Sequence, residues 1–322
     1  MAKLRITLAC GDYDRTRALQ EGAVQPEGVE LNVLNLGPEE IFYRMTRFRE
    51  FDASEFSLSI YNLLGGREGP FVAIPVFLSR RFRHSCIFVH RDAGIREPGD
   101  LRGKRVGVPK YYMTAAVWIR GILEDEYGVA PKDLHWFEGG QPKEFAEIGP
   151  PADVRVETIP GGRHVADMLE AGELDGLVTA RRPATFGSNS SPIRRLFPDP
   201  REVERAYYQK TGIFPIMHMI AIRRELVHEN PWLPRSLFTA FVEAKRMAYE
   251  RLTETAVLLT ALPWLVEEAE ATRALMGEDP FPYGVALNRK ALETLARYEF
   301  DQGLVRRRLP VDELFSESTL DT

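Results

Sequence analysis

The sequence predicts a two-lobed α/β protein in which one lobe is inserted into the other. Short apolar stretches typical of strands alternate with segments of helical periodicity, and this pattern restarts after His84. Long helices resume after Ile222, and 322 residues exceed the roughly 250–300 at which a single core stops growing. We expect lobe I to comprise residues 1–82 and 225–322 and lobe II residues 83–224, with a ligand cleft between them.

Lobe I is predicted to begin with a strand over residues 3–10, where apolar and polar side chains alternate. A second strand over 29–36 follows a Pro-Glu-Gly turn, and Pro38 begins a helix whose first turn is acidic, as the helix dipole favours. Further strands are expected over 51–59 and 71–78. Polar residues follow each of these strands.

Lobe II is predicted to repeat the alternation. A strand over 105–108 precedes a helix that Thr114 can cap and Gly128 can end. Strands over 154–159 and 174–180 flank a helix over 165–171. After a strand over 216–222 come long helices, and Asn288 can cap the last of them, which ends near Gly303.

Composition excludes several classes of protein. Acidic and basic residues are interleaved, the net charge is −5, and nucleic acid is therefore not an expected partner. No apolar run approaches the ~20 residues of a membrane span, so a membrane is not expected either. Cys10 and Cys86 give no disulfide framework and no zinc spacing. The oligomeric state stays open, with a homo-oligomer as one alternative.

The first predicted strand starts at residue 3, with no basic and apolar leader before it. Either a signal has been removed or the protein is cytoplasmic, and we expect the cytoplasm. Patterns for nucleotide binding, serine hydrolysis or a redox pair do not occur. In open α/β sheets ligands bind beyond the carboxyl ends of the strands, so polar residues there are the candidate site.

Six segments together resemble the 4,5-dihydroxyphthalate decarboxylase family over essentially the whole chain. They are 8–16 (LACGDYDRT), 55–59 (EFSLS), 75–84 (PVFLSRRFRH), 100–107 (DLRGKRVG), 212–218 (GIFPIMH) and 282–284 (PYG). The first, third and fifth segments are the most specific. The resemblance implies a type II periplasmic-binding-protein-like fold and an aromatic carboxylate as the small-molecule partner.

The chemistry that the resemblance implies needs no organic cofactor. A general acid protonates the ring carbon that bears the carboxylate, a para hydroxyl supplies electrons, and the ring becomes aromatic again as CO₂ leaves. The protein must supply cations for the carboxylates, an acid near the ring carbon and an acceptor for the phenol proton.

Histidines and carboxylates are the candidates for proton transfer. His84 follows an arginine-rich segment and His218 lies in an apolar strand, where a buried imidazole needs a partner. Asp12 and Glu55 are further catalytic candidates. A metal held by one of these histidines with Asp12 or Glu55 is a weaker alternative, because no paired-histidine spacing supports it.

Guanidinium groups match carboxylates with two hydrogen bonds, and tyrosines and serines can hold an aromatic ring. Lys110, Tyr111 and Thr114 join a strand end to a helix start, where anions are favoured. The complete set of predicted substrate-binding residues is Asp14, Arg15, Ser57, Ser59, Arg81, Lys110, Tyr111, Thr114, Arg181, Arg182 and Tyr283. Tyr13, Tyr61 and Tyr112 are further residues that could pack against an aromatic ligand and hydrogen-bond to it.

Two functions of different classes fit these residues. The first is a decarboxylase that converts a hydroxylated aromatic acid such as 4,5-dihydroxyphthalate to 3,4-dihydroxybenzoate. The second is a non-catalytic solute-binding protein for a small carboxylate. A synthase like the thiamine-pyrimidine enzymes of this fold lacks its metal-rich and cysteine-rich signatures here. The two histidines favour the enzyme.

Overall fold

The computed structural model describes residues 3–139, 150–188 and 190–322. The chain divides into two compact units. Unit 1 comprises Met1–Arg80, Ile216–Leu292 and Leu309–Thr322, and unit 2 comprises Arg81–Pro215 and Glu293–Arg308. Each unit is built on its own sheet, so the predicted α/β class with two sheets is confirmed.

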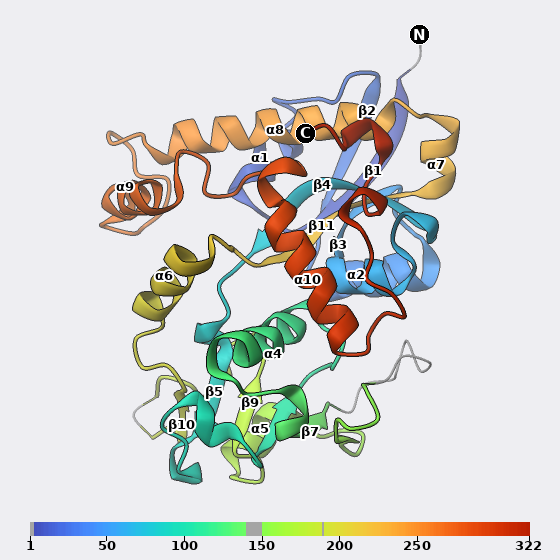
Figure 1. The fold of residues 1–322 in the computed structure, drawn as a ribbon. Coiled ribbons are helices and arrows are strands. Elements are labelled where there is room, and N and C mark those ends of the chain that lie inside the picture. The colour runs from blue at the N-terminus through green and yellow to red at the C-terminus, as the bar shows by residue number, and fades with distance from the viewer. Residues whose placement is uncertain (1–2, 140–149, 189) are drawn as a thin grey trace. The chain divides into compact units, whose positions relative to one another are not determined.

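Unit 1 contains a five-stranded sheet in the order β2-β1-β3-β11-β4 (Figure 1). Its strands are β1 (Leu4–Cys10), β2 (Val29–Asn35), β3 (Ala53–Ser57), β4 (Phe71–Arg80) and β11 (Ile216–Arg223). Strand β1 pairs in parallel with β2 and β3, whereas β11 runs antiparallel to both β3 and β4. Strand β11 therefore brings residues from late in the chain between two early strands.

Unit 1 contains the helices α1 (Arg17–Gln20), α2 (Pro38–Phe48), α3 (Leu58–Leu63), α7 (Arg224–Glu229), α8 (Leu233–Leu252) and α9 (Leu265–Met276). Helices α1, α2, α3, α7 and α8 contact the strands of this sheet, whereas α9 packs against α8. Pro38 occupies the first turn of α2, as predicted. The long orange helix α8 (Figure 1) buries Leu237, Phe241 and Ala248 along one side.

Unit 2 contains a six-stranded sheet in the order β10-β5-β9-β6-β7-β8. Its strands are β5 (Ile87–His90), β6 (Arg105–Val108), β7 (His135–Glu138), β8 (Val156–Thr158), β9 (Gly176–Val178) and β10 (Ile193–Arg195). The helices are α4 (Thr114–Tyr127), α5 (Val165–Glu170) and α6 (Pro200–Thr211), and α10 (Arg289–Asp301) begins in unit 1 and ends in unit 2. A core around Phe88, Leu169 and Leu177 supports the sheet.

The observed units differ from the predicted lobes at three places, the shortest of which is residues 81–82, predicted in lobe I and found in unit 2. Strand 216–222 was predicted in lobe II, but β11 forms hydrogen-bonded ladders with β3 and β4 and so belongs to unit 1. Residues 293–308 were predicted in lobe I and belong to unit 2. The chain thus passes between the units after Arg80, Pro215, Leu292 and Arg308, because strand partners are chosen in space rather than along the sequence.

Two element boundaries also correct the prediction. The strand expected over 51–59 ends at Ser57, and Ser59 and Tyr61 lie on α3. Thr114 was expected to cap the helix after β6, but it is the first residue of α4, and Met113 holds the capping position. Gly128 ends α4 in the left-handed conformation, with a φ of 64°, as predicted. Within the described residues, no helix combines the length and apolar character that a membrane crossing requires.

Candidate active site

Glu55 is the centre of a hydrogen-bond cluster in unit 1. It lies on β3, whose five residues are all buried, and its side chain is fully enclosed. Its Oε2 accepts from the backbone N–H of Gly11 at 2.9 Å, and its Oε1 accepts from the hydroxyl of Tyr13 at 2.6 Å. A buried carboxylate with this many donors is stabilised in its charged form.

His218 is the third partner of Glu55. It lies on β11 opposite Ser57, and its Nδ1 is 2.6 Å from Oε1 of Glu55. Burial raises the pKa of Glu55. The hydrogen bond and the charge of His218, together with the hydrogen bonds from Tyr13 and Gly11, lower it by more than burial raises it, so the pKa of Glu55 lies below its ordinary value. Because an ionised Glu55 only accepts hydrogen bonds, Nδ1 of His218 is the donor.

The imidazole of His218 is fixed in direction and still open to solvent. Its side chain is 19% exposed, and the ring of Phe42 packs edge-on against it, with the centroids 4.9 Å apart. With Nδ1 held by the carboxylate, Nε2 is the nitrogen through which protons can be exchanged. A carboxylate behind an imidazole holds one tautomer and stabilises the protonated ring, so the pair can serve as a general acid or base.

The turn after β1 brings Tyr13 to this pair. A Cβ added at Gly11 would lie 2.9 Å from Cε2 of Tyr13 and 3.3 Å from Oε2 of Glu55, so only glycine allows this approach. Burial, and then the charge of Glu55, raise the pKa of Tyr13, which therefore remains a hydrogen-bond donor. The turn thus presents a neutral hydroxyl to an ionised carboxylate.

The other predicted residues of this turn have different surroundings. Asp12 is exposed and forms no ion pair with any residue that the structure describes. Arg15 is buried, with Nη1 2.7 Å from Oδ1 of Asp14 and Nη2 2.9 Å from the carbonyl oxygen of Leu78. Asp14 and Arg15 therefore neutralise each other, and we do not assign them to the Glu55–His218 cluster.

Of the remaining candidates in unit 1, Ser57 caps α3 by accepting from the backbone N–H of Ile60 at 3.4 Å. Ser59 is buried on α3. Tyr283 is buried below the ammonium group of Lys245, which lies 4.3 Å from its ring centroid. The hydroxyl of Tyr61 donates to the carbonyl oxygen of Leu314 at 2.6 Å, so this tyrosine is structural.

The structure places His84 in unit 2, whereas His218 and Glu55 lie in unit 1. Its side chain is enclosed by the rings of Phe197, Tyr207 and Tyr127, and the residue is only 1% exposed. Burial lowers the pKa of His84 to about 4. A neutral, enclosed imidazole cannot deliver a proton at neutral pH, so His84 is a poor candidate for the general acid.

Tyr111 is also part of the core of unit 2. Its ring is 3.7 Å from the guanidinium of buried Arg120, and its backbone N–H donates to Glu138 at 2.9 Å. Thr114 is buried and Lys110 is half-buried. The arginines Arg81, Arg181 and Arg182 are exposed residues of unit 2.

Two features of unit 1 were not predicted from the sequence: the hydrogen bond between Tyr13 and Glu55, and the burial of Lys245. Tyr13 was expected to pack against a ligand or hydrogen-bond to it, and its link to Glu55 depends on a contact across 42 residues. Lys245 is buried on α8, where its Nζ bonds Asp279 and donates to the carbonyl oxygen of Phe281 at 3.0 Å. A lysine four residues after Phe241 on an apolar stripe was the available signal for a buried cation.

Within the described parts of the chain, no group of three or more histidine, cysteine, aspartate or glutamate side chains is placed to hold a metal ion. Of the pairs named as a possible metal site, the structure shows the contact between His218 and Glu55.

The fold and the cluster define a class of protein: a periplasmic-binding-protein-like α/β fold that carries a carboxylate–imidazole pair. The periplasmic aliphatic sulphonate binding protein SsuA from Escherichia coli aligns over 99% of each chain with 12% identity and a TM-score of 0.53. The alkanesulfonate-binding protein SsuA from Xanthomonas axonopodis pv. citri aligns over 98% of each chain with the same identity and TM-score. At this identity the likeness establishes the fold alone.

Sequence comparison gives the family. A 4,5-dihydroxyphthalate decarboxylase from Comamonas testosteroni is 39% identical over 327 aligned positions, covering 100% of this chain and 99% of the relative. A 4,5-dihydroxyphthalate decarboxylase from Pseudomonas putida is 39% identical over 214 positions, covering 65% and 83%. No family model matches the chain. The chain belongs to the 4,5-dihydroxyphthalate decarboxylase family, which confirms the family that the six sequence segments indicated.

Proposed function

We propose that this protein is a carboxy-lyase that converts 4,5-dihydroxyphthalate to 3,4-dihydroxybenzoate and CO₂. Family membership supports the reaction, and the contact between His218 and Glu55 is the observation that carries the mechanism. A protein that only binds a solute needs cations and hydrogen-bond donors, but it needs no imidazole oriented by a buried carboxylate.

In the proposed mechanism His218 delivers a proton from Nε2 to the ring carbon that bears the departing carboxylate. The hydroxyl para to that carbon supplies the electron pair, and the C–H bond forms as the ring loses aromaticity. The C–C bond to the carboxylate then breaks, CO₂ leaves, and its electron pair restores the aromatic ring. One proton enters and one CO₂ departs, so the reaction balances without an external oxidant.

Glu55 and Tyr13 act as positioning residues in this proposal. The carboxylate of Glu55 stabilises the imidazolium before proton transfer and holds Nδ1 afterwards. The Tyr13 hydroxyl and the Gly11 N–H fix the carboxylate in turn. Because Glu55 is fully enclosed, no water competes for these bonds, and the pair keeps its direction through the reaction.

The substrate carries two carboxylates, and cations must hold them. We propose that exposed guanidinium groups among Arg81, Arg181 and Arg182 contribute to this binding. Arginine suits the task since its planar fork forms two parallel hydrogen bonds with one carboxylate.

The assay for this proposal follows CO₂ release from 4,5-dihydroxyphthalate with the His218→Gln variant and a matched control, His228→Gln, which changes an exposed histidine. We expect the first change to lower turnover by about 10²–10⁴-fold, the usual contribution of a positioned general acid. The control should behave like the parent. In deuterated water the product should carry deuterium at the vacated carbon. Tight binding by the parent protein without CO₂ release would instead support a solute-binding protein.

A further inference from the structure

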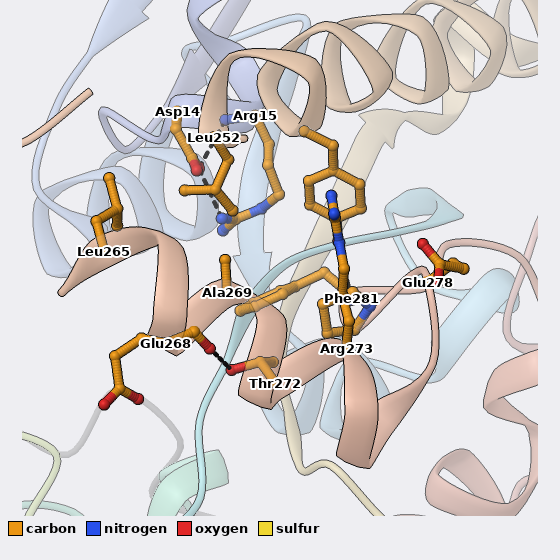
Figure 2. Close-up of a pocket in the computed structure, with 12 residues that line it drawn as sticks. Asp14, Arg15, Leu252, Leu265, Glu268, Ala269, Thr272, Arg273, Glu278 and Phe281 are labelled. Carbon is orange, nitrogen blue, oxygen red and sulfur yellow. Dashed lines mark hydrogen bonds and ion pairs between the residues drawn. The ribbon is translucent and has the colours of Figure 1, made fainter. Parts of the chain in front are cut away.

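A cavity of about 220 Å³ lies in unit 1 and shares no lining residue with the Glu55–His218 cluster. Its walls come from the turn after β1, the end of α8, helix α9 and the segment 278–281 (Figure 2). Most of the lining is apolar or aromatic: Tyr249, Leu252, Leu265, Ala269, Pro280 and Phe281. The walls therefore suit a flat apolar ring.

Arg15 gives the cavity a buried cation. The residue is only 9% exposed, its guanidinium stacks 4.3 Å from the centroid of Phe281, and Asp14 occupies Nη1. Its Nε is buried and has no hydrogen-bond partner among the residues described. Holding such a donor beside an apolar wall is costly unless the site gains an acceptor at some stage of function.

Arg273 gives the cavity a second cation. It rises from α9 into the space between the labelled residues in Figure 2, and it forms no ion pair within the described ranges of the chain. The carboxylate of Glu268 points away from Arg273 in the same view, and Glu278 is an exposed residue. Asp14 already neutralises Arg15, and the guanidinium of Arg273 is the second cation in a lining that also includes the carboxylates of Glu268 and Glu278.

We propose that this cavity is a second binding site, one that takes a planar aromatic carboxylate. A cavity of ~150 Å³ is enough to hold benzene, so 220 Å³ accommodates a ring with a carboxylate and hydroxyl groups. The ring packs against Phe281 and Leu252, and its carboxylate pairs with Arg273. Nothing in the proposed decarboxylation requires this site, so the inference goes beyond that function.

The second site is connected to Glu55 and His218 through side-chain contacts. Arg15 lies in the turn that carries Tyr13, and its guanidinium is 5.3 Å from the centroid of the Tyr13 ring. Tyr13 in turn donates to Glu55. A ligand that shifts Arg15 therefore acts on a segment that positions the carboxylate, which gives the bound carboxylate a means to modulate turnover.

Calorimetry with 3,4-dihydroxybenzoate tests the site. We expect two binding sites per chain in the parent and in His218→Gln. Ala269→Trp fills the cavity and should leave one site, and Arg273→Ala should weaken one site at least tenfold. Arg251→Ala, an exposed arginine on α8, is the matched control and should keep both sites. Circular dichroism confirms that each variant is folded.

A single site in the parent protein, or two unchanged sites in both Ala269→Trp and Arg273→Ala, would overturn the proposal. Because the readout is stoichiometry and affinity rather than CO₂, a failure of the decarboxylase assignment would leave this result intact. A failure of the second site would likewise leave the decarboxylase assignment standing.

Discussion

Nδ1 of His218 lies 2.6 Å from Oε1 of Glu55, across 163 residues of sequence. The same oxygen accepts the hydroxyl of Tyr13, and the other oxygen accepts the N–H of Gly11. One buried carboxylate thus collects three donors from two separate segments, the turn after β1 and strand β11, and each donor provides a way to test the proposed chemistry.

Glu55→Gln should lower turnover by about 10³–10⁴-fold, because an amide neither stabilises the imidazolium nor enforces the Nδ1-protonated tautomer. Substrate affinity should change much less, since arginines rather than Glu55 are proposed to hold the substrate carboxylates. Initial rates of CO₂ release at saturating substrate measure the effect. Glu229→Gln, at an exposed position, is the control. A Glu55→Gln enzyme with parental turnover would remove Glu55 from the mechanism.

Tyr13→Phe should lower turnover by about tenfold and shift the acid limb of the kcat profile to higher pH. The Tyr13 hydrogen bond lowers the pKa of Glu55, so its loss raises that pKa, and the carboxylate that orients His218 becomes protonated at a higher pH than in the parent. A pH–rate profile measures the shift. A loss of rate with an unchanged profile would mean that Tyr13 has only a structural role. Tyr43→Phe, at a half-exposed tyrosine of α2, should match the parent.

Gly11→Ala should reduce turnover with little loss of stability. The added Cβ would lie 2.9 Å from the Tyr13 ring, so the ring must move and its hydroxyl leaves Glu55. We expect a rate close to that of Tyr13→Phe. The control is Gly161→Ala, since a Cβ there meets no atom within 4 Å. If Gly11→Ala instead unfolds the protein in a thermal melt, the turn is needed for folding and the prediction is wrong.

The burial of His84 should make the folded protein less stable in acid. Burial lowers the pKa of His84 from its ordinary value of 6.5 to about 4 in the folded protein. Between these two pH values the unfolded chain therefore binds a proton at His84 that the folded chain does not. The free energy of unfolding should therefore decrease between pH 6.5 and pH 4, by about 3 kcal/mol at most, and level off below. Urea unfolding of the parent and of His84→Phe measures this contribution.

The His84→Phe protein should lose that part of the pH dependence, because phenylalanine does not titrate. Where this variant does not fold, an NMR titration of the His84 ring in the parent gives the same information. A ring that titrates near pH 6.5 in the folded protein would contradict the prediction.

Arg81→Ala should weaken binding of an aromatic dicarboxylate by about 2–3 kcal/mol, the scale of a charge-assisted contact with two hydrogen bonds. Arg81→Lys should restore only part of the affinity, since an ammonium group cannot reproduce the planar fork. Calorimetry with phthalate measures both variants. Arg306→Ala, at an exposed arginine, should bind like the parent. Equal affinity for parent and Arg81→Ala would exclude Arg81 from the binding site.

Local signals in the sequence determined many elements of the fold. Strand β6 spans the predicted residues 105–108, Pro38 begins α2, and Gly128 ends α4. These features depend on side-chain alternation, a fixed φ and the freedom of glycine, all of which act over a few residues. The family resemblance likewise depended on contiguous segments. Both kinds of information can be taken from the sequence without knowing what packs against what.

The composition of the active site was decided by tertiary structure. Glu55 and His218 were both candidates from sequence, but their pairing requires β11 to return from unit 2 and enter the first sheet beside β3. His84 was an equal candidate by residue type, and only its enclosure by three aromatic rings separates it from His218. Direction, burial and hydrogen-bond partners arise from contacts between distant segments, and no local pattern carries them.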